Sequence, residues 1–184
     1  MTLAPRIDGT VAVRSSAAQL LPALRQRVAA GLVLGRPHPR SRYQLAEAGP
    51  NHMRIRAADW PTAINVGLNE VDIRLAQPGA AHFRVRYWRW AAYVLGLGGV
   101  IGLVGLVLLL AVDVRGYIAR HPSSRVPGLS ADQSLAAAWA MVLFWGFVWP
   151  WLLIALHKRP LRRLVARLIA EVDAEAAGAT APIR

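Results

Sequence analysis

Arginine alternates with apolar residues along two stretches of the chain that are typical of β-strands. Side chains at alternate positions of a strand point to the same face, so these arginines should share one face of a sheet. A guanidinium is a planar fork that pairs with carboxylate or phosphate oxygens. We therefore expect either an anion-binding face, with lipid headgroups as the ligand, or a face that is simply solvated. One acidic residue, Asp72, is expected to offset the five arginines, which are Arg54, Arg56, Arg74, Arg84 and Arg86.

Residue patterns typical of enzymes do not occur in the sequence. Cysteine is absent, which excludes a thiolate nucleophile and a zinc ribbon. No phosphate-binding loop, GxGxxG or GxSxG motif occurs either. The five histidines do not fall at metal-ligand spacing on a common helix; they are His38, His52, His82, His121 and His157. We therefore predict a non-catalytic protein that acts by binding, with no cofactor and no metal site.

Hydrophobicity is concentrated in two windows of a strongly basic chain. The 184 residues include 55% hydrophobic residues and carry a formal net charge of +12. Residues 91–112 and 135–156 contain no charged side chain, and a helix of about 22 residues matches the thickness of a bilayer core. We predict transmembrane helices over 91–113 and 135–157. Because neither window contains an ionisable residue, a pump or coupled transporter is not expected.

Basic residues near the ends of these windows predict the orientation. Arg84, Arg86 and Arg89 precede the first window, and Lys158, Arg159, Arg162, Arg163 and Arg167 follow the second; the connecting segment 114–134 has Arg115, Arg120 and Arg125. The positive-inside rule then places both termini in the cytoplasm and the connecting segment outside. The expected location is a bacterial-type inner (plasma) membrane, crossed twice.

Small residues recur at four-residue spacing in both windows. Such spacing lets helix backbones approach closely. The two windows could pack on each other as a hairpin, or the glycine face could form a homo-oligomer. Pro150 is expected to bend the second helix, since it leaves the Gly146 carbonyl without its usual partner. The predicted packing residues are Gly98, Gly102, Gly105, Ala136 and Ala140.

Residues 1–90 predict a small cytoplasmic α+β domain. A strand over 7–13 leads to Ser16, which forms a capping-box pattern with Gln19. The helix that follows could be divided by Pro22 and should stop at Gly31. A loop over 35–41 comes next.

Two hairpins are then expected, strands 43–47 with 52–57 and strands 71–75 with 82–88, together with a strand over 63–66. These segments predict an antiparallel sheet of four or five strands whose apolar face is covered by the helix. The last strand enters the first membrane window without a flexible linker. This order of elements resembles the opening of helix-grip domains of the START type, in which a long final helix holds an apolar ligand against a curved sheet. The resemblance lies in element order alone, and a membrane span stands where the final helix would lie.

Residues 158–184 predict a basic amphipathic helix that starts at Pro160, followed by a disordered tail from Ala176. Its apolar face is expected to lie on the headgroups or against the sheet domain. Its basic residues join the sheet arginines as expected headgroup ligands: Lys158, Arg159, Arg162, Arg163 and Arg167.

The sequence as a whole therefore predicts a membrane-anchored interaction or scaffold module. Its basic cytoplasmic domain would bind a protein partner or anionic lipid headgroups, within a homo-oligomer or a larger membrane complex. An alternative is a lipid-handling protein with an apolar pocket between sheet and helix. A nucleic-acid-binding module is the weakest candidate, since an aromatic belt at the membrane surface already accounts for the tryptophans beside the arginines.

The orientation can be tested with reporters in intact cells. Because basic residues divide eight to three between the two sides, both termini should be protected from external protease, and a reporter fused at Gly128 should be exposed. Exposed termini with a protected Gly128 fusion would reverse the assignment.

Overall fold

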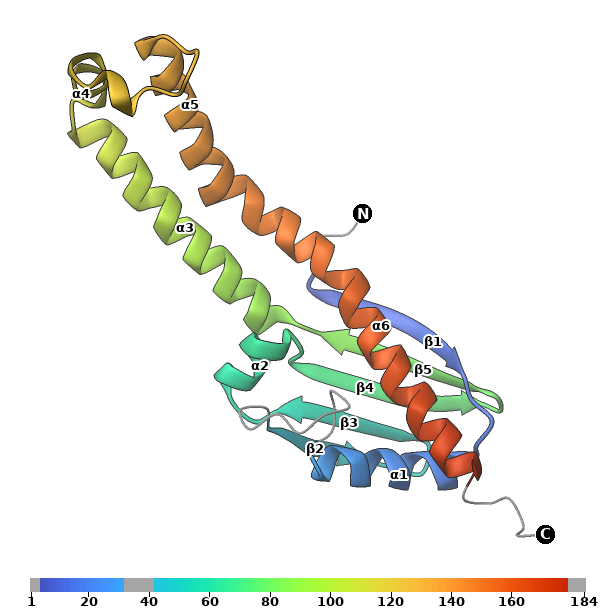
Figure 1. Ribbon diagram of the computed structural model, residues 1–184. Helices are drawn as coiled ribbons and strands as arrows, with labels where there is room; N and C mark the ends of the chain where they lie inside the picture. The colour runs from blue at the N-terminus through green and yellow to red at the C-terminus, as the bar shows by residue number, and fades with distance from the viewer. Residues whose placement is uncertain (1–3, 32–41, 179–184) are drawn as a thin grey trace. The chain divides into compact units, whose positions relative to one another are not determined.

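A computed structural model of the chain describes residues 4–31 and 42–178. The predicted loop 35–41 and the last six residues of the predicted tail lie outside the described residues. The chain is α+β, with a five-stranded antiparallel sheet and several helices (Figure 1). It divides into two compact units, residues 1–91 with 156–184, and residues 92–155.

The sheet of the first unit has the order β1-β5-β4-β3-β2. Its strands are β1 (Arg6–Ala12), β2 (Tyr43–Ala48), β3 (His52–Ala57), β4 (Glu70–Gln77) and β5 (Ala80–Arg86). Both predicted hairpins are confirmed, as β2 with β3 and β4 with β5. The first strand of the chain pairs with the last one, β5. The predicted alternation is also confirmed, since Ile55, Ile73 and Val85 are each buried to 1% exposure or less.

The helix after β1 forms as its cap predicts. α1 (Ala17–Ala29) begins at a capping box in which the Ser16 N–H donates to Gln19 Oε1 at 3.0 Å. Pro22 lies inside a single helix and does not divide it, because a proline there removes only one backbone hydrogen bond and the helix is anchored by buried leucines. Gly31 follows the helix with a positive φ of 72°, as expected of a helix stop.

The predicted strand over 63–66 is wrong, because this segment belongs to helix α2 (Trp60–Val66). The Asp59 carboxylate accepts the Thr62 N–H at 2.8 Å, and Pro61 occupies the first turn, where its missing N–H has no partner to lose. Gly67, at φ 71°, ends the helix. These start and stop signals outweigh the strand preference of the β-branched residues between them.

The C-terminal helix packs against the sheet domain. α6 (Trp149–Gly178) runs through Pro160 without a break, so a new helix does not begin there, and residues 176–178 are helical instead of disordered. The predicted apolar face is buried: Leu161, Val165, Leu168, Ile169 and Val172. Of the two surfaces expected to cover this face, the structure shows the sheet domain.

A buried carboxylate joins α6 to the connection between β1 and α1. Asp173 is 6% exposed, and its oxygens accept the Arg14 N–H at 2.9 Å and the Ser15 N–H at 2.9 Å. Burial by itself raises the pKa of Asp173, but these hydrogen bonds outweigh burial and hold the pKa below its usual range. Two ion pairs on the surface, from Arg27 to Glu171 and Glu175, link α1 to the same turn of α6.

The second unit contains the apolar parts of two long helices. Its elements are α3 (Trp88–Ala111), α4 (Val114–Arg120), the 3₁₀ turn η1 (Pro122–Ser124), α5 (Ala131–Leu143), the π turn η2 (Phe144–Val148) and the start of α6. Two helical stretches, 88–111 and 131–178, are long and apolar enough to cross a membrane. The π turn ends two residues before Pro150, and at its end the Trp149 N–H donates to the Phe144 carbonyl five residues back.

The glycines of α3 lie against the second apolar stretch in the same chain. A methyl group at Gly98 would collide with Pro150, and one at Gly102 would lie 2.9 Å from the Gly146 Cα. Gly105 likewise lies close to Val142. Ala136 and Ala140, the predicted partners of the glycines, are exposed, and Val142 and Gly146 take that place instead.

The Asp173 contact predicts a specific stability profile. Asp173→Ala leaves buried N–H groups without an acceptor and should lower the free energy of unfolding by about 1–3 kcal/mol. Because the folded pKa is depressed, the stabilisation is present above the ordinary pKa of about 3.9 and is lost as the pH falls through the folded value. Asp173→Asn should therefore be less stable than the wild type at pH 7 and lose less stability on acidification.

Thermal unfolding in detergent between pH 3 and pH 7 measures both effects. Glu171→Gln, two residues away in an exposed ion pair, is the matched control and should change stability by less than about 1 kcal/mol. Equal losses of stability from Asp173→Ala and Glu171→Gln would contradict a stabilising role for the buried Asp173 hydrogen bonds.

Candidate functional site

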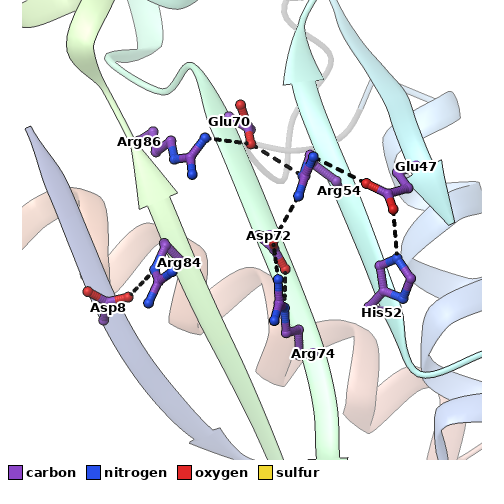
Figure 2. Close-up of polar contacts among 9 residues, drawn as sticks. All are labelled: Asp8, Glu47, His52, Arg54, Glu70, Asp72, Arg74, Arg84 and Arg86. Carbon is purple, nitrogen blue, oxygen red and sulfur yellow. Dashed lines mark hydrogen bonds and ion pairs between the residues drawn. The ribbon is translucent and has the colours of Figure 1, made fainter. Parts of the chain in front are cut away.

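The candidate site is the face of the sheet opposite α1 and the last half of α6. We call it the charged ladder and define it by nine residues: Asp8, Glu47, His52, Arg54, Glu70, Asp72, Arg74, Arg84 and Arg86 (Figure 2). On β3, β4 and β5 the ladder residues alternate with core residues, so the burial of the apolar face fixes which side chains these strands present. Glu47 faces Arg54 because the register of β2 shifts between Leu45 and Glu47.

Strand register places five of these residues in one row across the whole sheet. The paired positions run Glu47, Arg54, Asp72, Arg84 and Asp8, from β2 through β3, β4 and β5 to β1. Charge therefore alternates in sign from one edge of the sheet to the other. Directly opposed side chains in neighbouring strands lie close enough to interact, and opposite charges at such positions are favourable.

Ion pairs join most of the ladder. Arg54 reaches Glu47 at 3.2 Å, Glu70 at 3.3 Å and Asp72 at 3.4 Å. Arg74 contacts Asp72 at 3.0 Å. Two further pairs lie at the β5 side, Arg84 with Asp8 at 2.6 Å and Arg86 with Glu70 at 3.4 Å. Arg54 is thus a cation shared by three carboxylates.

Asp72 is the least exposed carboxylate of these ion pairs, with 14% of its side chain exposed. Burial alone raises its pKa, but hydrogen bonds and charge from Arg74 and then Arg54 outweigh burial and lower the pKa below its usual range. In return, Asp72 raises the pKa of the Arg74 guanidinium. Asp72 and Arg74 are therefore both charged at neutral pH.

The five predicted arginines do share one face, but the expectation that Asp72 alone offsets them is wrong. Asp8, Glu47 and Glu70 also contribute carboxylates. Among the described residues, Arg56 is the one arginine of the five without an ion-pair partner. Asp8 and Glu47 could have been assigned only with the order and register of the edge strands, and Glu70 lies one residue before the predicted start of its strand.

The basic residues of α6 are not part of the ladder, because α6 packs on the apolar face of the sheet. Arg159, Arg163 and Arg167 are exposed there, and Lys158 is partly buried. Arg162 differs from them because it lines a surface hollow of about 530 Å³ together with Arg74, Arg84 and others. In the same hollow, Thr10 Oγ1 lies 3.0 Å from His82 Nδ1.

The ladder presents charged side chains of both signs at the surface. In the part of the chain that the structure describes, no three histidine or carboxylate side chains lie close enough together to hold a metal ion. The chain matches no protein-family model, and no curated protein or solved structure is similar to it.

The shared position of Arg54 predicts an effect on stability. Arg54→Ala leaves three carboxylates close together and should lower the free energy of unfolding by about 1 kcal/mol, with the loss shrinking as salt screens the repulsion. Arg56→Ala, on the same face of the same strand, should change it by less than about 0.5 kcal/mol. Thermal unfolding over a salt series compares the two, and equal losses would contradict the shared-cation interpretation.

Proposed function

We propose that this protein is a membrane-anchored, non-catalytic interaction module that binds a protein partner through the charged ladder. Two apolar helices anchor it, and both termini face the cytoplasm of a bacterial-type inner membrane. The observation that carries the proposal is the row of alternating charge across all five strands.

Membrane anchoring is supported by the surface of α3. Large apolar side chains are exposed along it, including Val100 at 61%, Leu103 at 60% and Leu110 at 74%. Apolar area left in water costs roughly 25 cal/mol per Å². A helix with such exposure along its length is stable in a lipid environment, where those side chains meet acyl chains.

A protein partner fits the ladder better than a uniform layer of lipid headgroups. An anionic surface is attracted to cations that stand free, but four of the five sheet arginines are already paired with carboxylates. A pattern that alternates in sign instead matches a surface carrying the complementary alternation. Complementary charge patterns of this kind provide specificity between proteins.

The alternative of a lipid-handling protein would need an apolar cavity between the sheet and its helices. Side chains fill that space: the largest fully buried ones include Tyr87, Leu20, Leu24, Met53, Ile55 and Ile169. A filled core favours a binding module that works through its outer surface. It gives less support to a pocket for an acyl chain.

Photocrosslinking of the full chain in its own cells tests the proposal. A benzoylphenylalanine at position 74, whose side chain is 62% exposed, should form a discrete adduct with one protein. The same probe at Arg163 on α6 is the control for nonspecific capture. An adduct with lipid alone at position 74 would favour headgroups and contradict the proposal.

A matched charge swap separates binding from folding. Asp8→Arg combined with Arg84→Asp keeps an ion pair between β1 and β5 but reverses its polarity. Like charges placed across an interface cost several kcal/mol, so the yield of the adduct should fall at least about tenfold. Position 84 also lies opposite Asp72, so the swap should lower the free energy of unfolding, but by less than about 1 kcal/mol. An adduct yield unchanged by the swap would show that the charge pattern of the ladder does not determine partner binding.

A further inference from the structure

Two exposed tryptophans from separate parts of the chain meet around one arginine. Trp60 and Trp88 pack edge to face with ring centroids 5.7 Å apart. The Arg89 guanidinium carbon lies 5.5 Å from the Trp60 ring centroid and 5.6 Å from that of Trp88. We call these three residues the indole clamp. It is stabilised by cation–π attraction, and it is separate from the charged ladder.

The indole clamp joins the sheet domain to the first residues of α3. Trp60 begins α2, between β3 and β4, and Trp88 is the first residue of the apolar helix α3 (Figure 1). The Arg89 N–H also donates to the Asn69 side-chain oxygen at 3.3 Å, immediately before β4. α2 is therefore fixed beside the point where the chain enters its apolar helix.

Exposure distinguishes the indole clamp from core packing. Trp60 is 47% exposed and Trp88 is 48% exposed, although the neighbouring Tyr87 is completely buried. A soluble surface gains little from two half-exposed indoles. Tryptophan is instead enriched at the boundary between lipid and water, where its ring contacts acyl chains and its N–H meets headgroups.

We propose that the indole clamp is a lipid-interface contact through which α2, an element of the sheet domain, rests on the bilayer that α3 enters. The occupant is the headgroup boundary of that bilayer, with Trp60 and Trp88 inserted at its edge and Arg89 placed to meet lipid phosphate. This inference rests on the proposed membrane anchoring of α3. It adds a second contact, remote in sequence from the membrane helices, that limits how the sheet domain can turn.

Single-cysteine spin labelling of the full chain tests the contact, because the natural chain has no cysteine. Labels are placed at Trp60→Cys, at Leu103→Cys in the middle of α3, and at Gln77→Cys in the β4–β5 hairpin. The protein is reconstituted in vesicles of phosphatidylcholine with phosphatidylglycerol. For each label we compare the rate of collision with oxygen, which concentrates in lipid, with the rate of collision with a water-soluble nickel chelate. The ratio of oxygen to nickel collisions should rise from position 77 to position 60 to position 103.

The labels distinguish the two proposals. If the ratio of oxygen to nickel collisions is high at position 103 but no higher at position 60 than at position 77, the interface contact is overturned and membrane anchoring remains. An aqueous signal at 103 overturns membrane anchoring, and the contact fails with it. A label at 60 shielded from both probes also overturns the contact, since it would place protein over the clamp.

A second measurement avoids the loss of the indole. Trp60→Phe keeps an aromatic ring, and the fluorescence of the wild type minus that of this variant reports on Trp60. Lipids brominated near the headgroup should quench this difference more strongly than lipids brominated at the acyl terminus. Equal or absent quenching by both would contradict a position at the interface.

Discussion

Burial of one face of the sheet beneath α1 and the last half of α6 is the constraint on which the first unit depends. A five-stranded antiparallel sheet needs only one covered face, and here the cover comes from both ends of the chain. Asp173 attaches the C-terminal part of α6 to the sheet domain, because it accepts the backbone N–H groups of Arg14 and Ser15, which follow β1. The same closure determines which side chains remain outside, because strand side chains alternate with a period of two. The charged ladder is thus a consequence of how the core is closed.

The position of β1 completes that ladder. Pairing of β1 with β5 brings Asp8 beside Arg84, although 76 residues separate them in the chain. Without β1 the row would end on an arginine, and the β5 edge of the face would be more basic. With it, the row begins and ends on a carboxylate, which changes the expected partner from a uniformly anionic surface to a patterned one.

Different surfaces of one small domain would perform different tasks. The ladder would select a partner, and the indole clamp beside α3 would limit the orientation in which the ladder is offered. A tether alone lets a domain rotate freely about its attachment point. Two attachments restrict that rotation and reduce the orientational freedom lost when a partner binds.

Local patterns in the sequence determined the hairpins, the alternation along the strands, the cap of α1 and the two apolar stretches, because each depends on residues near one another in the chain. Segments with competing local signals were harder: residues 63–66 favour a strand by composition, but the Asp59 cap and Pro61 make them helical. Only the tertiary structure decided that β1 lies beside β5, that Arg54 is shared by three carboxylates, and that Trp60 meets Trp88. These contacts join segments far apart in sequence, and their register follows from closure of the common core, which no local pattern encodes.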